Sequence, residues 1–365
     1  MPEQLNAEQE KYLGITTDLI NILSTGYNDP NRGDVIAASK KAGLYTLTQP
    51  GKFGGGQANN QVLSVIREAL ASANVPFTRW IFGPGPGVLA DCNAHVESHY
   101  LKPLLDGSLR CAFAFTEPSD ASHPTRAQID GDNFIVDGRK SYVTGGSDAN
   151  FINTYVDIQP GGKSLLIIDT KLPGVHIDQV FQSLDGSHHA EFRFEEVVVP
   201  CKNLIGAIGK GLPRAMRQIG DTRLAYAAEA VGLMRWICGF VEEHIKAPHA
   251  SGKPLGKREG VRLRYADMRI QTYTARSMLY RTARLADTGE NVMNEVIAAK
   301  VYTTETLACV LDSAIQLVGG KALVETHPLA ILYRRIRALR IAEGASDVLR
   351  LSLSRGALEL NLGRL

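Results

Sequence analysis

The spacing of apolar residues changes twice along this chain, and this change limits the possible folds more than any other feature. Residues 1 to about 110 contain stretches with apolar residues at helical spacing, among them AEQEKYLGITTDLINIL and NQVLSVIREALASA. From residue 110 to about 205 the period becomes two, as in AEFRFEEVVV. The helical period then returns and holds to the end. Helices and strands in separate blocks predict an α+β fold rather than alternating βαβ units.

The three blocks predict three domains. We expect an N-terminal α-helical domain over residues 1–110, a small central β domain over 111–205 and a C-terminal four-helix bundle over 206–365. The last block contains MRQIGDTRLAYAAEAVGLMRWICGFVEEHI, an alanine-rich stretch without proline, as a long packed helix requires. Two further helical stretches follow, LRYADMRIQTYTARSMLYRTARLAD and MNEVIAAKVYTTETLACVLDSAIQLV.

The β block carries one turn signal. Asp137 and Gly138 lie inside FIVDGRKSYVTG, and Asp-Gly is a pair typical of a two-residue hairpin turn. SLLIID and AEFRFEEVVV are typical of strands, because the second alternates apolar and charged residues. We therefore expect the chain to reverse at Asp137–Gly138.

Composition excludes several classes of protein. Of the 365 residues, 44% are hydrophobic and 21% are charged, and the formal net charge is +2, so no general nucleic-acid or membrane surface is predicted. The N-terminal MPEQLNAEQEKYLG is polar and lacks the apolar core of a signal peptide. No run approaches the roughly 20 apolar residues of a membrane span. We expect a cytoplasmic protein that binds neither nucleic acid nor a membrane.

No metal site is predicted. The five cysteines are far apart and form no CxxC pair, which argues against a disulfide framework and a zinc site. His95 and His99 could share a helix face, but HVESH matches neither HExxH nor HxxEH. A pair of surface histidines on one helix is the simpler interpretation.

One carboxylate lies in an unexpected place. In RIAEGASDVLR, Glu343 lies among apolar residues and directly before Gly344. A buried charge is costly unless it is paired. Glu343 therefore either faces solvent or has a chemical role.

Four stretches of this chain together resemble the acyl-CoA dehydrogenase family of flavoproteins. CAFAFTEPSDAS is similar to the family pattern A-x-x-x-TEPxAGS, and GRKSYVTGGSDANF is similar to GxKxWITNGxxA. FEEVVVPCKNLIG is similar to F-x-x-V-x-VP-x-x-NLLG, and the Glu343 stretch is similar to EGTSEIxR. They occur in the family's order and cover nearly the whole chain, which is far more specific than any one motif.

The resemblance implies FAD-dependent α,β-dehydrogenation of an acyl-CoA thioester in acyl-chain metabolism. Glu343 matches the base that removes the α-proton, while flavin N5 accepts the β-hydrogen as hydride. Such a reaction needs base and flavin on opposite faces of the Cα–Cβ bond. It also needs a polarised thioester carbonyl, which the N–H of the base could provide. The family passes its electrons to an electron-transfer flavoprotein.

The resemblance also assigns roles to further residues. Arg223 matches an arginine on the helix lining the active site, where a cation would favour the ionised form of Glu343. Ser122 matches a residue that contacts pantetheine, and Gly344 allows close approach of the backbone to the substrate. The matches for FAD binding are Phe113, Phe115, Thr116, Tyr142, Thr144, Gln316, Gly319, Gly320 and Asp347. In the family the QxxGGxG segment reaches the FAD of a neighbouring subunit, which implies a homodimer or homotetramer.

Each of these residue types also has a purely structural explanation. Thr116 could belong to a TEP turn, and Tyr142 and Thr144 favour strands in any case. Gly319 could simply end a helix. The catalytic interpretation therefore depends on the combination of motifs.

Several positions depart from the family pattern. Pro248 stands where the family has an arginine that grips the FAD pyrophosphate, and a neutral proline cannot make that contact. Ala121 replaces the glycine of AGS, and Ala345 replaces the threonine of EGT. We therefore predict weaker retention of FAD than in typical members.

Three alternatives remain open at this point. The same fold could act on a thioester attached to a carrier protein, or could carry out a different flavin reaction, although Glu343 argues against a monooxygenase. The chain could also be a non-catalytic partner subunit of a hetero-oligomer. A DNA-associated relative of the fold is disfavoured by the modest net charge.

Overall fold

The computed structural model describes residues 4–26, 30–249 and 252–363, and the chain divides into two compact units. The helical unit consists of Met1–Thr48, Gln57–Phe82 and Gly220–Leu365. The β unit consists of Gln49–Gly56 and Gly83–Ile219. The helices and strands are segregated as predicted, in an α+β fold with a helical C-terminal region.

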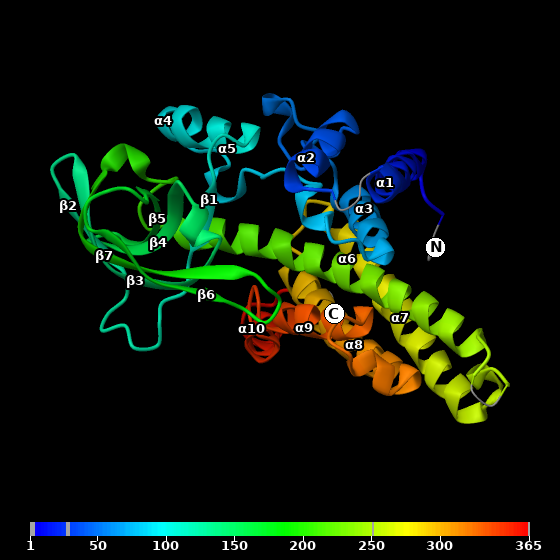
Figure 1. Ribbon diagram of the computed structural model, residues 1–365. Coiled ribbons are helices and arrows are strands. Elements are labelled where there is room, and N and C mark those ends of the chain that lie inside the picture. Colours follow the sequence, from blue (N-terminus) through cyan, green and yellow to red (C-terminus); the bar gives the residue numbers. More distant parts are fainter. Residues whose placement is uncertain (1–3, 27–29, 250–251, 364–365) are drawn as a thin grey trace. The chain divides into compact units, whose positions relative to one another are not determined.

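A curled seven-stranded sheet forms most of the β unit (Figure 1). The strand order is β1-β4-β2-β3-β7-β6, and β5 pairs with β4 outside this path. β3, β6 and β7 pair antiparallel, whereas β1 and β2 both run parallel to β4. The strands are β1 (Cys111–Ala114), β2 (Arg126–Asp130), β3 (Asn133–Thr144), β4 (Phe151–Gln159), β5 (Gly162–Asp169), β6 (Val175–Gln182) and β7 (His188–Pro200).

The predicted hairpin turn at Asp137–Gly138 is wrong. Both residues lie inside β3, where the pairing with β7 is irregular between Val136 and Gly138. Gly138 has φ +142°, and a Cβ there would approach the Thr125 Cα to 2.6 Å. The glycine therefore permits close contact within a continuous strand. The chain reverses earlier, since Asp130 pairs with Asn133.

Residues 83–110 pack on the sheet. Two short helices, α4 (Ala94–Val96) and α5 (Lys102–Asp106), flank a turn of π-helix in this segment. Their buried residues, such as Leu101, form one apolar cluster with Phe151 of β4 and Leu165 of β5. The predicted boundaries at residues 110 and 205 therefore do not coincide with the edges of the two units, because this helical segment completes the core of the sheet.

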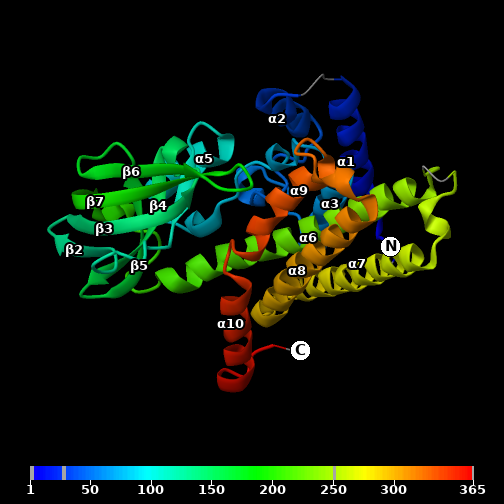
Figure 2. The ribbon, with the colours of Figure 1, turned by 60° about the horizontal axis from the view of Figure 1, so that its bottom comes forward.

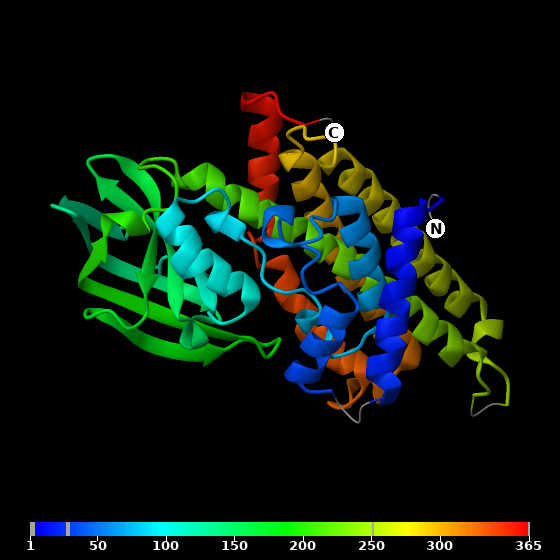
Figure 3. The same cartoon turned by 90° about the horizontal axis from the view of Figure 1, so that it is seen from above.

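Eight helices form the described part of the helical unit, and α6 enters it at Gly220. α7 and α8 lie side by side (Figure 2), and α1 packs against α3 (Figure 3). The helices are α1 (Ala7–Gly26), α2 (Arg32–Lys41), α3 (Asn60–Ala73), α6 (Gly211–Lys246), α7 (Glu259–Ala286), α8 (Met293–Val318), α9 (Pro328–Arg337) and α10 (Ser346–Glu359). The predicted helical stretches are confirmed.

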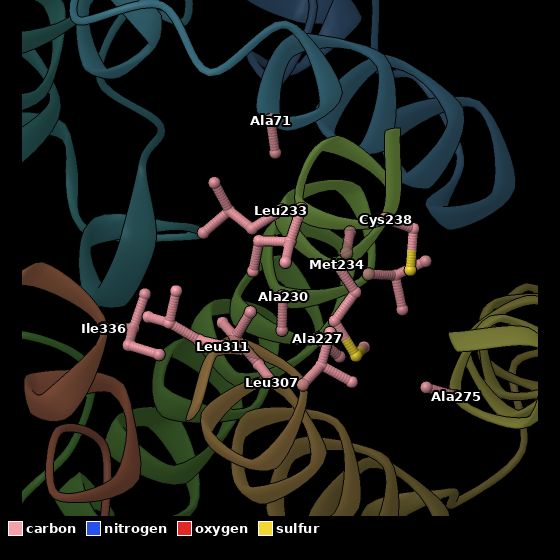
Figure 4. Close-up of a cluster of buried hydrophobic side chains, with 14 of the residues drawn as sticks. Ala71, Ala227, Ala230, Leu233, Met234, Cys238, Ala275, Leu307, Leu311 and Ile336 are labelled. Atoms are coloured by element: carbon pink, nitrogen blue, oxygen red, sulfur yellow. The ribbon is translucent and has the colours of Figure 1, made fainter. Parts of the chain in front are cut away.

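The core of the helical unit is built around the middle of α6 (Figure 4). Ala227 and Ala230 present small side chains, which lie near Leu307 and Leu311 of α8. Gly232 faces α3 so closely that a Cβ would lie 2.4 Å from the Glu68 carbonyl oxygen. Small residues at these positions let three helices approach closely, and this packing fixes α6 and α8, which both contribute to the candidate site.

α6 is also long and apolar enough to cross a membrane, judged by length and composition alone. However, 61% of its apolar window is buried inside the protein. Its residues from Leu224 to Ile245 supply much of the core of the helical unit. The apolar character of α6 is therefore explained by its central position in the bundle.

Candidate active site

Glu343 lies in a turn between a 3₁₀ helix (Ala338–Arg340) and α10. Its backbone is left-handed, with φ +55°, and Gly344 follows with φ +104°. A left-handed residue with a side chain costs of the order of 1–3 kcal/mol and persists only where its surroundings hold it. We refer to residues 341–345 as the base turn.

Two cations from different helices hold the base turn. The Arg223 Nε of α6 donates to the Glu343 carbonyl oxygen at 2.9 Å. The Lys300 Nζ of α8 donates to the Gly344 carbonyl oxygen, also at 2.9 Å. Arg223 is 8% exposed and Lys300 is fully buried. The φ of Gly344 favours glycine, and a Cβ there would also make a tight contact of 3.0 Å with the Leu349 Cδ2.

Burial and the nearby cations shift the pKa of Glu343 in opposite directions. Burial raises the pKa of the Glu343 carboxyl, while Arg223 and Lys300 lower it by a smaller amount, so the pKa lies above its usual value. Burial, reinforced by the Arg223 charge, lowers the pKa of Lys300 to about 8. Within the described part of the chain, the Glu343 carboxylate makes no hydrogen bond and no ion pair. It is therefore a partly buried acid whose proton affinity is raised and whose oxygens have no partner among the described residues.

Arg223, Glu343 and Gly344, which the sequence predicts for the active site, lie together in the structure. Lys300 joins them and is not among the predicted residues. The available signal was a lysine inside the apolar helical run VIAAKVY, which is the same kind of anomaly that singled out Glu343. A charged residue on the buried face of a predicted helix needs a partner, and here the partner is a carbonyl of the base turn.

A second group of predicted residues lies on β3 of the β unit. Tyr142 is left-handed, with φ +55°, and lies where β3 has one more residue than β7 between paired positions. Its ring is exposed and meets the rings of Phe181 and His189 edge-on. The neighbouring Ser141 N–H donates to the Thr116 carbonyl oxygen at 2.9 Å. A β-bulge therefore turns an aromatic ring outward beside Thr116.

Thr144 ends β3 and begins a chain of polar contacts. Its Oγ1 lies 3.1 Å from the His189 Nδ1, and the His189 Nε2 lies 3.0 Å from the Ser187 Oγ. Ser187 in turn donates to the Asp185 Oδ1 at 2.6 Å. Thr144 itself is exposed. The sequence analysis did not anticipate His189, because nothing in the sequence indicated its register opposite Thr144.

Thr116 and Phe115 border a cavity of about 300 Å³ in the β unit. Phe115 stacks on Tyr155, with ring centroids 4.8 Å apart, and lies 5.9 Å from the ring of Phe113. Neither Tyr142 nor Thr144 lines this cavity. The structure therefore divides the predicted FAD residues of the β unit between the cavity and the exposed face around Tyr142, with Thr116 next to both.

The loop after Thr116 is held by a buried lysine. The Lys140 Nζ donates to the Phe115 carbonyl oxygen at 3.1 Å and to the Glu117 Oε1 at 3.0 Å. Glu117 also accepts from the Thr125 N–H at 2.7 Å. Burial acts to raise the pKa of Glu117, but the Thr125 amide and the Lys140 ammonium outweigh it, so the pKa is lowered. This anchoring leaves Ser122 exposed in the loop, as a substrate contact requires.

The remaining predicted FAD residues lie in the helical unit, at the end of α8 and in the first turn of α10. Gly319 ends α8 with φ +79°, which confirms the helix stop, and Gln316 and Gly320 are exposed beside it. Asp347 lies in the first turn of α10 with its side chain 98% exposed. The contacts that these residues make to FAD stay predictions. Pro248 is exposed in the loop after α6.

Comparison of this chain with known proteins identifies its family. The family models for the middle domain and the C-terminal domain of acyl-CoA dehydrogenases match residues 112–197 and 209–358. A short-chain specific acyl-CoA dehydrogenase of Clostridium acetobutylicum is 31% identical over 268 residues, covering 71% of each chain. This chain belongs to the acyl-CoA dehydrogenase family.

Other relatives cover almost the whole chain. A subunit of a caffeyl-CoA reductase–Etf complex of Acetobacterium woodii is 26% identical over 355 residues, covering 93% of each chain. The crystal structure of a probable acyl-CoA dehydrogenase of Mycobacterium abscessus superimposes with a TM-score of 0.81 at 26% identity, covering 96% of this chain and 98% of that one. Acyl-CoA dehydrogenases act on CH–CH groups of acyl-CoA and in general use FAD.

The residues of the β unit fit such a cofactor. Tyr142 offers an outward aromatic ring that is 63% exposed, and Thr116 and Thr144 are exposed hydroxyl residues nearby on the same part of the sheet. A planar heterocycle with polar edges needs this combination of a stacking surface and hydrogen-bonding groups. No group of three or more metal-ligating side chains occurs in residues 4–26, 30–249 and 252–363.

Proposed function

We propose that this chain is an FAD-dependent acyl-CoA dehydrogenase in which Glu343 removes the α-proton of the acyl thioester. The observation that carries the proposal is the base turn. It contains a partly buried carboxylate with a raised pKa and no partner among the described residues, and two helices hold it in a left-handed conformation. A general base is most effective when its pKa lies near the working pH, and burial moves a carboxyl in that direction.

The backbone of the base turn supports the second requirement of the reaction. Within the described part of the chain, the Glu343 N–H makes no hydrogen bond. It can therefore donate to the thioester carbonyl oxygen, where negative charge develops as the α-proton leaves. The carbonyl of the same residue is held by Arg223, so this peptide group is fixed before substrate arrives. Base and oxyanion donor then belong to one rigid residue.

FAD would supply the acceptor for the β-hydrogen, which leaves as hydride. In the β unit, Tyr142 would stack on its ring system, and Thr116 and Thr144 would hydrogen-bond its polar edges. In the helical unit, Gln316, Gly319 and Gly320 would contact the FAD of a second copy of the chain, as in the family. Pro248 cannot hold a phosphate, so retention of FAD would be weaker than usual.

The proposal includes an electron-transfer flavoprotein as electron acceptor and a cytoplasmic location. The Acetobacterium woodii relative, which is named as part of a complex with Etf, supports the acceptor. The proposal also includes a homo-oligomer. Leu263, Ile270 and Tyr273 on α7 are each more than 60% exposed, and an outward row of large apolar side chains on one helix is typical of an interface. Light scattering on the purified protein tests this directly.

A second candidate is the same chemistry in the opposite direction. The Acetobacterium woodii relative is named a reductase, and reduction of an enoyl thioester needs an acid that protonates Cα. A carboxyl whose pKa is raised by burial holds its proton to higher pH, as such an acid must. An equilibrium titration of the FAD-loaded protein with an acyl thioester, and of its reduced form with the matching enoyl thioester, would show which direction is favoured.

The experiment is an anaerobic titration of the FAD-reconstituted protein with a panel of acyl-CoAs, followed by absorbance. Loss of the flavin band with one acyl-CoA, absent in Glu343→Gln, supports the proposal and narrows the acyl chain. Flavin binding without loss of the band by any acyl-CoA would point to a carrier-protein thioester or another flavin reaction. A protein that binds no flavin would contradict the proposal and favour a non-catalytic partner subunit.

A further inference from the structure

Lys300 is the most unusual charged residue of the helical unit. It lies in the middle of α8, its side chain is fully buried, and burial lowers its pKa to about 8. A buried ammonium is expensive, and a methionine of similar length would fill the same space without that cost. Among the described residues, its ammonium group donates one hydrogen bond, to the Gly344 carbonyl oxygen one residue after Glu343.

We propose that Lys300 is a positioning residue for the base: together with Arg223 it clamps two successive carbonyls and so keeps Glu343 in its left-handed conformation. This inference rests on the proposed role of Glu343. The two donors come from α6 and α8, and each distance is 2.9 Å. Left-handed backbone is unfavourable for glutamate, so the turn needs such restraints from outside its own sequence.

These two hydrogen bonds hold the backbone and leave the Glu343 carboxylate without a partner among the described residues. Neither cation forms an ion pair with the Glu343 side chain within the described residues, yet both charges lower its pKa. A direct salt bridge would neutralise the base and direct it away from substrate. Holding the backbone carbonyls instead provides orientation and a favourable charge while the carboxylate oxygens stay available for the α-proton.

The charge of Lys300 also depends on its surroundings. Arg223 on α6 and Arg340 on the 3₁₀ helix disfavour its protonation, while Glu343 and Glu305 favour it. Glu305 is itself occupied by Arg350, with contacts of 2.8 and 2.6 Å. Charges of both signs therefore act on the pKa of Lys300. Loss of Lys300 would remove a cation near Glu343 and so raise the pKa of that carboxyl.

The test uses the FAD-loaded protein and the acyl-CoA that removes the flavin band most rapidly. The first-order rate of that change is measured from pH 5 to pH 10 for wild type, Lys300→Met, Lys300→Arg and the control Thr303→Val. Thr303 is buried on the same helix and bonds only carbonyls of α8, so its substitution reports general loosening. Rates at several substrate concentrations give both the limiting rate and the substrate concentration at half-saturation.

For Lys300→Met we expect a limiting rate about 10- to 100-fold lower, because small misplacement of a base has effects of this size. The substrate concentration at half-saturation should change less than about twofold, since in this proposal substrate does not contact Lys300. The pH midpoint of the rate should move upward, because the ionised base has lost a neighbouring cation. Lys300→Arg, which keeps the charge, should restore the midpoint.

Wild-type behaviour of Lys300→Met would overturn the inference and leave the proposed function intact. Equal losses in Lys300→Met and Thr303→Val would overturn it as well, since the effect would then be general. If Lys300→Met does not fold, Lys300→Gln is measured instead: it lacks the charge but keeps a donor, so the pH midpoint should still move upward, and an unchanged midpoint would contradict the inference. If no acyl-CoA affects the wild-type flavin, both the proposed function and this inference fail.

Discussion

Two glutamates of the helical unit, one buried and one partly buried, differ in how their carboxylates are satisfied. Glu68 of α3 is 1% exposed and is surrounded by partners: Arg235 and Arg276 each lie 2.7 Å from its Oε1, and Tyr280 donates to its Oε2. The Glu343 carboxylate has no partner among the described residues, while the cations nearby hold its backbone. A carboxylate with all its partners holds helices together, whereas one without them is available for chemistry.

This difference is only partly visible in the sequence. Both glutamates interrupt apolar runs, VIREALA for Glu68 and RIAEGAS for Glu343. The partners of Glu68 lie about 170 and 210 residues further along the chain, so local spacing gives no sign of them. What distinguishes the two positions is the glycine after Glu343, because a left-handed turn needs one there.

The largest effect that we predict is on catalysis by Glu343→Gln. Removing the general base should lower the rate of flavin reduction by about 10²–10⁴-fold. Rapid-mixing absorbance with the active acyl-CoA measures this rate. The free energy of unfolding at neutral pH should not fall, because the substitution removes a partly buried charge that has no partner among the described residues. A variant that unfolds readily but keeps its rate per folded molecule would reverse the comparison.

The same variant should change how stability depends on pH. The pKa of Glu343 is raised in the folded protein, so its contribution is fully present below the unfolded pKa of about 4.3 and is lost as pH rises through the folded pKa. Relative to wild type, Glu343→Gln should therefore gain stability as pH rises across this window. Thermal midpoints of both proteins from pH 4 to pH 7 test the sign.

Glu68→Gln should have the opposite profile. Removing one partner from a buried ionic network leaves the others uncompensated and costs about 3–5 kcal/mol. Chemical unfolding measures this loss, and the rate of flavin reduction per folded, FAD-loaded molecule should be retained. Arg235→Gln is the matched control, since Arg235 is 44% exposed at its side chain and should contribute only about 0–1 kcal/mol. Equal losses in both variants would show that Glu68 is not the centre of the network.

Lys300→Met should alter stability in the alkaline range. The folded pKa of about 8 lies below the unfolded value near 10.4, so the contribution of Lys300 is present above the unfolded pKa and lost as pH falls through the folded one. The advantage of Lys300→Met over wild type should therefore shrink by about 3 kcal/mol between pH 7 and pH 10.5. Chemical unfolding of both proteins at the two pH values measures this change. If the difference in unfolding free energy stays constant, the pKa of Lys300 is not lowered by folding.

Ala345→Ser is expected to give the smallest effect. Ala345 occupies the N-cap of α10 with extended backbone (φ −57°, ψ +144°), and no side chain caps this helix end. A serine there can accept from the first-turn N–H groups and should stabilise the protein by about 0.5–2 kcal/mol. The thermal midpoint measures this gain. Ala345→Val, which adds no acceptor atom and is a poor N-cap residue, is the control, and equal stabilisation by both would contradict the capping explanation.

The fold was largely predictable because it depends on periodicity and local signals. α3 and α8 begin and end at the residues where the apolar pattern begins and ends. The turn at Asp137–Gly138 was mispredicted, because the same dipeptide that favours a hairpin also permits a close approach to Thr125 inside a strand. A local signal cannot distinguish these two outcomes when the deciding contact is tertiary.

The candidate site was predictable only where motifs were available. Glu343, Gly344 and Arg223 were identified from the sequence, and the structure brings them together. Lys300 and His189 carry no motif, and the partner of each becomes visible only when a distant segment is placed beside it. The sequence showed which residues could carry the reaction, but not which residues hold them in place.

The division of the chain into interleaved segments has a consequence for its synthesis. The β unit is complete once residue 219 has left the ribosome, whereas the helical unit uses both the first 82 residues and everything after residue 220. α1 and α3 must therefore wait, with apolar residues such as Val65 and Ala71 uncovered, until α6, α7 and α8 have been made. At roughly 5–20 residues per second, this delay is of the order of ten seconds or more. Until then, this part of the apolar surface of the nascent N-terminal helices stays exposed.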